Sequence, residues 1–293
     1  MPTKVFYSPS YAAAGHSFDT TRMAQWVAES LIESPIAGLE LIAPEPISVA
    51  QLSEVHAHAY IQAVQTGNPR WLAQSQGFSW DPGCWPMVLA SNGGAVQSAL
   101  AALSDGVSGS LSSGLHHARR DRGSAFCTFN GLALTAKSAP QSKVLIIDLD
   151  AHCGGGTYSL IAGDPRIWQL DVSVCTTDFY EPVEGGTLDI VEDASDYLPT
   201  IEHRLRELEK RPTKFDLCLY NAGVDPHEDC DIGGLEGITF DVLAERERIV
   251  FAWCRQQKIP VSFVLAGGYK GRDLSQGKLV DLHRLVLQEA AVP

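Results

Sequence analysis

The fold is decided by one stretch of sequence, Val144-Leu-Ile-Ile-Asp148-Leu-Asp150-Ala-His152-Cys-Gly-Gly-Gly156. Its apolar first half predicts a buried strand, and the glycines end that strand. Apolar runs that predict further strands lie at 5–7, 167–172, 215–220 and 261–266. Helical periodicity is found at 21–32, 88–103, 197–210, 240–257 and 279–289. Because these strands alternate with helices, the sequence predicts an α/β fold with a mainly parallel sheet between helices.

Length and composition limit the class of protein. The 293 residues fit one large α/β domain as well as two small ones. No apolar run approaches the roughly 18 residues of a membrane span, and the first residues lack the pattern of a signal peptide. The net charge of −13 disfavours a nucleic-acid partner. Seven cysteines without a C-x-x-C pair indicate free thiols. We therefore expect a cytoplasmic protein that binds neither nucleic acid nor membrane.

Chemically active side chains follow three of the predicted strands. Asp148, Asp150 and His152 are spaced two apart, so in an extended chain they share one face. Asp225 follows the strand at 215–220, and Tyr269 follows the strand at 261–266. The carboxyl ends of parallel strands meet at one edge of a sheet. Two carboxylates and an imidazole can hold a divalent metal with one coordination position open, as catalytic zinc sites do. The alternative is that the aspartates cap a turn and His152 is exposed.

Other polar residues have both a catalytic and an ordinary interpretation. The adjacent His116 and His117 can act as a general acid/base with a tuned neighbour, or they can be adjacent by chance. Tyr269 can donate to an oxyanion, or it can be a surface tyrosine. We expect His56 and His58 to form a solvated or half-buried pair, and the basic cluster at 119–122 to be a surface patch.

Five motifs occur in an order that resembles a known family. They are Gly114-Leu-His116-His117-Ala, Gly123-Ser-Ala-Phe126-Cys-Thr-Phe-Asn130, Asp148-Leu-Asp150-Ala-His152, Asn221-Ala-Gly-Val-Asp225 and Gly267-Gly268-Tyr269. Zinc-dependent histone deacetylases and acetylpolyamine amidohydrolases carry similar motifs in this order. Within this family the chain looks closest to the class IV deacetylases. That resemblance is carried by Ile147-Asp148-Leu-Asp-Ala-His, by Tyr220-Asn-Ala-Gly with Gly233-Gly234-Leu235 downstream, and by His16-Ser-Phe-Asp19.

The resemblance implies the arginase–deacetylase fold, with a single catalytic domain over residues 1–293 and a mainly parallel, eight-stranded sheet. It implies one catalytic zinc per chain, and a structural potassium ion near oxygens of the Asp148 strand. Position by position, the implied zinc ligands are Asp150, His152 and Asp225. The implied catalytic residues are His117 as general base and acid, His116 as its electrostatic partner held by Asp148, and Tyr269 as oxyanion donor. The implied substrate-binding residues are Phe126, Tyr180, Ile232 and Gly268.

Two positions depart from the family pattern. Cys153 replaces a histidine, and Gly155 replaces the Asn or Asp that polarises the general base. At Ile232, polyamine-specific members place a glutamate, so an apolar residue favours acyl-lysine as the substrate. The sequence therefore predicts a zinc-dependent amidohydrolase of acyl-lysine. The alternatives are a deacetylase of acetylated polyamines or other small amides, and a metal-holding binding module of weak activity, which Gly155 favours.

Overall fold

The computed structural model describes residues 2–16, 18–212 and 214–292, so Ser17 of the His16–Asp19 resemblance lies outside the described residues. Its centre is an eight-stranded sheet in the order β2-β1-β3-β8-β7-β4-β5-β6. All neighbouring strands pair in parallel. The strands are β1 (Thr3–Phe6), β2 (Leu39–Ile42), β3 (Val107–Ser110), β4 (Val144–Asp148), β5 (Ile167–Ser173), β6 (Gly186–Ile190), β7 (Leu217–Gly223) and β8 (Val261–Ala266).

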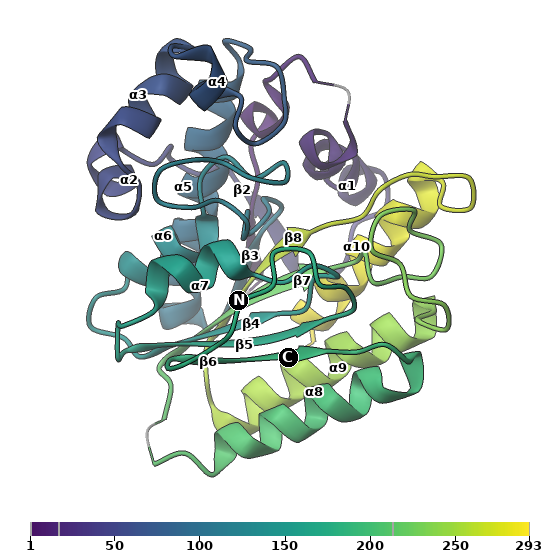
Figure 1. Ribbon diagram of the computed structural model, residues 1–293. Coiled ribbons are helices and arrows are strands. Elements are labelled where there is room, and N and C mark those ends of the chain that lie inside the picture. The colour runs from purple at the N-terminus through teal and green to yellow at the C-terminus, as the bar shows by residue number, and fades with distance from the viewer. Residues whose placement is uncertain (1, 17, 213, 293) are drawn as a thin grey trace.

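Helices cover both faces of this sheet (Figure 1). They are α1 (Met23–Glu33), α2 (Val49–Val55), α3 (His58–Thr66), α4 (Arg70–Ala73), α5 (Cys84–Asp105), α6 (Gly131–Lys137), α7 (Gly155–Ile161), α8 (Ala194–Glu209), α9 (Phe240–Gln257) and α10 (Gln276–Ala290), with short 3₁₀ turns η1 (Pro9–Ala12) and η2 (Asp19–Thr21). Along β4, Leu145 and Ile147 enter the core beneath α8, α9 and α10, whereas Val144 and Ile146 enter the core beneath α5 and α6. Burial on both faces explains why this strand is apolar at every position before Asp148.

The predicted fold class is confirmed, and the sheet is wholly parallel. The five predicted helical segments correspond to α1, α5, α8, α9 and α10. Helix α5 continues through Gly93 and Gly94. A side chain at Gly93 would overlap the backbone of Glu45, and one at Gly94 would overlap the hydroxyl of Tyr11. Close packing therefore selects glycine at these positions. The sequence missed β2, β3 and β6, which are short; β3 and β6 also lack a run of bulky apolar residues.

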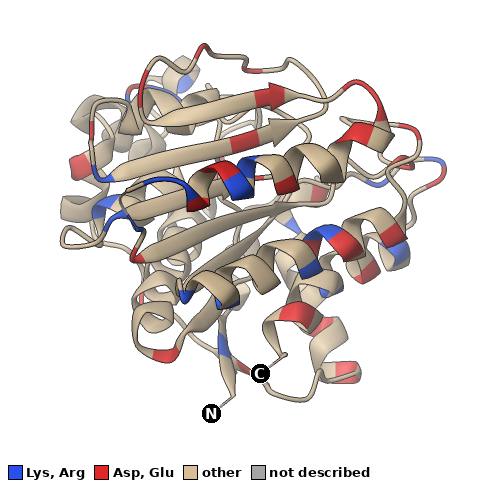
Figure 2. Cartoon of the chain, turned by 90° about the horizontal axis from the view of Figure 1, so that it is seen from below, with Lys and Arg blue, Asp and Glu red and all other residues tan. Residues whose placement is uncertain are grey.

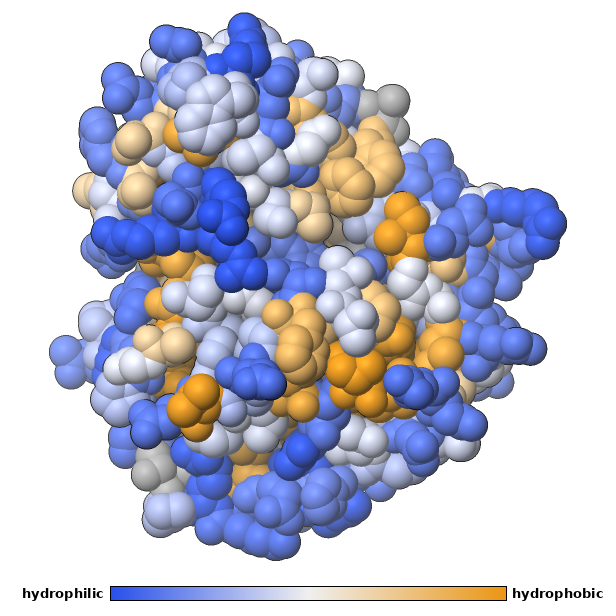
Figure 3. Space-filling model, in the orientation of Figure 1, coloured by the Kyte–Doolittle hydropathy of each residue, from blue (hydrophilic) through white to orange (hydrophobic). Residues whose placement is uncertain are grey.

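Acidic and basic positions are interspersed along the outer helices (Figure 2). In the space-filling view, hydrophobic residues gather near the middle of the face and hydrophilic residues surround them (Figure 3). Among the residues that the structure describes, no helix has the length and apolar character needed to cross a bilayer.

Candidate active site

Four strands deliver polar side chains to one edge of the sheet. His116 and His117 lie in the loop after β3, and Asp148 is the last residue of β4. Asp150 and His152 follow β4 by two and four residues, and Asp225 follows β7. Tyr269 lies in the loop after β8. Because β3, β8, β7 and β4 are consecutive in the sheet, their carboxyl ends bring these residues together.

Asp150, His152 and Asp225 form a group of metal-binding character. They are buried, and one donor atom from each lies within 4.8 Å of the others. The Nδ1 of His152 lies 3.0 Å from Asp150 Oδ1 and 3.2 Å from Asp225 Oδ2. Asp225 Oδ1 accepts a hydrogen bond from the Ala151 amide at 3.0 Å. Asp225 Oδ2 is buried and has no hydrogen-bond partner among the described residues. Two carboxylates and an imidazole, one of their buried oxygens without a hydrogen bond, fit a divalent metal such as zinc.

The two histidines differ in protonation. His116 donates from Nδ1 to Asp148 Oδ2 at 2.8 Å, and its Nε2 lies 3.6 Å from Asp150 Oδ1. Burial lowers the pKa of His116, but the two carboxylates outweigh it and raise that pKa to about 10. Burial and the neighbouring His116 charge lower the pKa of His117 below its ordinary value. The pair therefore offers a charged imidazolium beside a neutral imidazole, which is a division suited to acid–base chemistry.

The neutral histidine has a carboxylate partner that sequence reasoning missed. His117 Nδ1 lies 3.0 Å from Asp178 Oδ2, and Asp178 also forms an ion pair with Arg119. Asp178 lies in the loop between β5 and β6, for which the sequence shows no strand or helix pattern. The prediction that Arg119 belongs to a surface patch is wrong, because its side chain reaches this carboxylate and is only 28% exposed. In the sequence, Gly155 indicates only that the expected polar partner of His117 is missing from its usual position.

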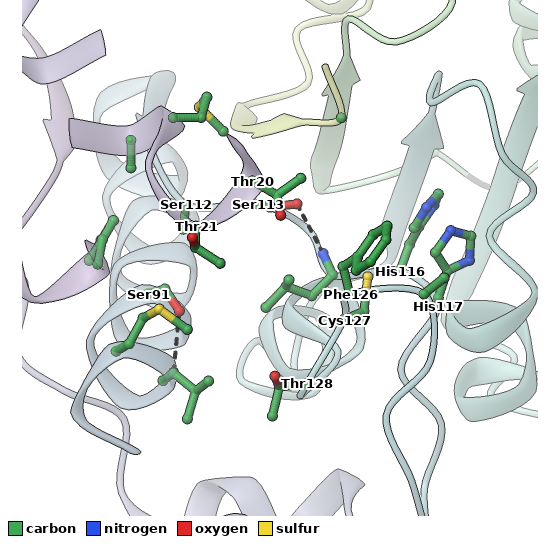
Figure 4. A pocket seen from close by; sticks show the side chains of 18 of the residues that line it. Thr20, Thr21, Ser91, Ser112, Ser113, His116, His117, Phe126, Cys127 and Thr128 are labelled. Carbon is green, nitrogen blue, oxygen red and sulfur yellow. Dashed lines mark hydrogen bonds between the residues drawn. The ribbon is translucent and has the colours of Figure 1, made fainter. Parts of the chain in front are cut away.

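A pocket opens beside these residues (Figure 4). His116 and His117 lie together near the ring of Phe126, and Ser91 of α5 lies across the pocket. Phe126, Phe78 and Tyr269 contribute aromatic surface to the lining. The Phe78 and Phe126 rings stack with their centroids 5.3 Å apart, and Phe18 packs 4.5 Å from Phe126. An aromatic cluster of this kind can enclose an apolar chain with a polar end.

Tyr269 lines this pocket. Its side chain is buried, and burial followed by the Asp225 charge raises the pKa of its phenol above the ordinary value. The phenol therefore stays protonated at neutral pH and can donate a hydrogen bond.

Two predicted substrate-binding positions, Tyr180 and Gly268, differ from the expectation. The Tyr180 hydroxyl donates to Asp171 Oδ2 at 3.2 Å, and its ring stacks on Tyr158, so Tyr180 is not the wall opposite Phe126. Gly268 faces Leu279 and Val224, whereas Gly267 lines the pocket.

Ile232 is 39% exposed and is outside the pocket lining. The next residue, Gly233, packs against the His152 ring, since a Cβ there would lie 3.1 Å from its Cε1. The role of Ile232 at the pocket mouth stays a prediction.

His56 is a structural residue and not a solvated one. It is 1% exposed, its Nε2 accepts from the Asn130 amide at 3.0 Å, and its Nδ1 lies 2.9 Å from the carbonyl oxygen of Arg119. Since an amide can only donate, His56 is neutral and donates from Nδ1. The exposed His58 matches the sequence expectation more closely. All seven cysteines are free, as predicted.

Fold and site together define a hydrolase of the deacetylase type, in the arginase–deacetylase fold. The histone deacetylase domain model matches residues 16–283, and the chain belongs to the histone deacetylase family. An uncharacterized protein of Picosynechococcus sp. is 31% identical over 92% of this chain and 93% of its own length.

Two further similarities are to a relative named as a histone deacetylase and to a solved structure named as an acetylpolyamine aminohydrolase. Histone deacetylase 2 of Arabidopsis thaliana is 32% identical over 60% of this chain and 48% of its own length. The crystal structure of acetylpolyamine aminohydrolase from Burkholderia pseudomallei superposes with a TM-score of 0.80 at 16% identity, covering 98% of both chains. At this identity the structural likeness concerns the fold. The potassium ion and the cytoplasmic location stay predictions.

Proposed function

We propose that this chain is a zinc-dependent deacylase that hydrolyses acyl-lysine side chains in a peptide or protein. One observation carries the proposal: Asp150 and His152 of the metal-binding group line the same pocket as His116 and His117, and Asp225 completes that group beside them. Zinc, when bound there, supplies a Lewis acid for the amide carbonyl and for the attacking water.

The chain's own residues supply the proton transfers. His117, neutral at working pH, takes a proton from the attacking water and returns one to the leaving amine. His116 keeps its positive charge, because Asp148 and Asp150 stabilise it. The Tyr269 hydroxyl donates a hydrogen bond to the carbonyl oxygen as negative charge develops.

The pocket lining suits a lysine chain on one side and an acyl chain on the other. The rings of Phe126 and Phe78 can cover the methylene groups of the lysine. Apolar residues of α1, α5 and the end of β3 extend the lining away from these rings: Met23, Ala24, Met87, Val88 and Leu111. We therefore include acyl groups longer than acetyl in the proposed substrate range.

Acetylated polyamines are the second candidate substrates. The net charge of −13 suits a cationic ligand, and a structural relative is named as an acetylpolyamine aminohydrolase. The prediction that Ile232 lies at the pocket mouth stands against them, because an apolar side chain there cannot pair with a distant ammonium group.

The deciding experiment compares kcat/KM of the zinc-loaded protein on an acyl-lysine peptide, acetylspermidine and acetylputrescine. We expect the peptide to be preferred, with activity lost on chelation and restored by zinc. A tenfold or greater preference for the polyamines, about 1.4 kcal/mol in transition-state binding, would overturn the acyl-lysine assignment. Absence of turnover with every substrate would favour the metal-holding binding module instead.

A further inference from the structure

One position of the family motif, next to the general base, has no polar side chain in this protein. Gly155 stands where the family pattern that the sequence resembles has an Asn or Asp in contact with the general base. Here the space around it is filled from another loop. A Cβ at Gly155 would overlap the backbone oxygen of Asp178 and lie 2.9 Å from its Oδ1. A side chain at 155 and the observed position of Asp178 therefore exclude each other.

Asp178 makes the contacts that an acidic residue at 155 would be expected to make. Its Oδ2 lies 3.0 Å from His117 Nδ1 and accepts a hydrogen bond from the Gly156 amide at 2.9 Å. Its Oδ1 is held by the guanidinium of Arg119, which also donates to the Gly155 carbonyl at 3.2 Å. The side chains of His117 and Asp178 are only 5% and 13% exposed.

These contacts determine which nitrogen of His117 carries the proton. Burial raises the pKa of Asp178, but its contacts with His117 and Arg119 outweigh burial, so the pKa lies below its ordinary value. Asp178 is therefore ionised, and an ionised carboxylate can only accept hydrogen bonds. His117 must then donate from Nδ1, and the neutral ring keeps its lone pair on Nε2. Nε2 is the nitrogen left to act on a molecule in the pocket that His117 lines.

We propose that Asp178, held by Arg119, is the positioning residue that fixes His117 in the Nδ1–H tautomer and so takes over the role left open by Gly155. The chain thereby keeps a polarised general base although the motif residue is missing. The proposal rests on the proposed deacylase function for its kinetic consequence. The tautomer itself does not depend on the identity of the substrate.

The tautomer can be measured directly. Long-range proton–nitrogen NMR of protein with nitrogen-15-labelled histidine distinguishes Nδ1–H from Nε2–H, and His117→Ala identifies the signal. We expect Nδ1–H in the unaltered protein. In Asp178→Ala we expect a shift toward Nε2–H, the form that free histidine prefers. An Nε2–H signal in the unaltered protein, or no change in the variant, would overturn the proposal.

Kinetics test the consequence. Asp178→Ala should lower kcat about 10- to 100-fold, with KM within about threefold and zinc content unchanged, because the residue acts through His117 and not on the substrate or metal. Asp178→Asn keeps an accepting oxygen and should lose less than Asp178→Ala. An unchanged kcat in Asp178→Ala, measured on protein that melts normally, would overturn the positioning role.

A matched control separates this role from simple loss of an ion pair. Asp164 and Lys137 have side chains 13% and 28% exposed, the same values as Asp178 and Arg119. Asp164→Ala should therefore lower stability in a similar way and leave kcat and the His117 tautomer unchanged. If the unaltered protein turns over no acyl substrate, the proposed function fails, and the NMR measurement still decides the role of Asp178.

Discussion

Two regions support the histidine pair, and they differ in how the backbone holds them. At the sheet edge, Asp148 ends β4, is fully buried, contacts His116 at 2.8 Å and accepts from Asn221 of β7 at 2.8 Å. In the β5–β6 loop, Asp178 contacts His117 at 3.0 Å from a left-handed backbone with φ of 60°. Strand pairing fixes the first carboxylate, whereas the Arg119 side chain and the amide of Gly156 in the first turn of α7 fix the second. We therefore expect the loop to open more readily than the sheet edge.

The largest expected effect comes from breaking the sheet edge. Asp225→Ala removes one of the three candidate metal ligands and leaves only Asp150 and His152. We expect loss of most bound zinc and a fall in kcat/KM of about 10³-fold or more. Metal analysis by mass spectrometry and turnover of an acyl-lysine peptide measure both. Full zinc occupancy in the variant would contradict the ligand assignment.

The second effect is a pH dependence of stability that should act on the loop side of the site and not on the sheet edge. The folded pKa of His56, lowered by burial to about 4, lies below its ordinary 6.5, so the unfolded chain binds more protons between these values. Stability should therefore fall as pH drops from 6.5 to 4, by about 3 kcal/mol at most from this residue. Because His56 holds the Arg119 carbonyl, the loop side of the site should loosen first.

Urea unfolding at several pH values measures this slope. His56→Gln does not titrate, so its stability should fall less steeply than that of the unaltered protein over this range. The exposed His58 provides the control, and His58→Gln should keep the original slope. Equal slopes for His56→Gln and the unaltered protein would show that His56 does not carry the effect.

The third effect concerns a residue that the loop after β8 holds in the pocket. Tyr269→Phe removes the hydroxyl and keeps the ring, which packs 6.2 Å from Phe126. We expect kcat to fall by about 10²-fold with zinc still bound. Steady-state kinetics alongside metal analysis check this expectation. Unchanged kcat/KM would place Tyr269 outside the chemistry.

The sequence predicted the sheet edge better than the loops, for a physical reason. Asp148, Asp150 and His152 follow a continuous apolar strand, so strand period and parallel topology are enough to bring them together with Asp225. No such rule applies to the β5–β6 loop. The resemblance suggested Tyr180 as a pocket wall, but its hydroxyl bonds to Asp171 instead.

Asp178 carries no motif and reaches His117 only through the conformation of its loop. The strands β3 and β6 were missed because Val107-Ser-Gly-Ser110 and Gly186-Thr-Leu-Asp-Ile190 contain few bulky apolar side chains. Hydrogen bonding to the neighbouring strands holds them in the sheet. Local pattern thus predicts positions that regular structure fixes, and it cannot predict contacts that a loop makes across space.

The smallest effect should come from the residue that the loop turns away from the pocket. Tyr180→Phe removes its hydrogen bonds with Asp171 and Gln169, which costs about 1 kcal/mol of stability. We expect kcat/KM to change less than about threefold. Phe126→Ala, in the lining itself, should instead raise KM clearly. A large KM increase in Tyr180→Phe would restore the tunnel-wall role that the sequence suggested.

The strand order also constrains how the protein is made. β8 lies between β3 and β7, so it joins a half-sheet built from residues 3–110 to another built from residues 144–223. His116 and His117 extend from the first half, whereas Asp150, His152 and Asp225 extend from the second. A growing chain on the ribosome therefore carries both halves of the site before the strand that joins them exists. Catalytic competence arises late in synthesis, when residues 261–266 leave the exit tunnel and insert, and until then the facing edges of β3 and β7 stay open to wrong pairing.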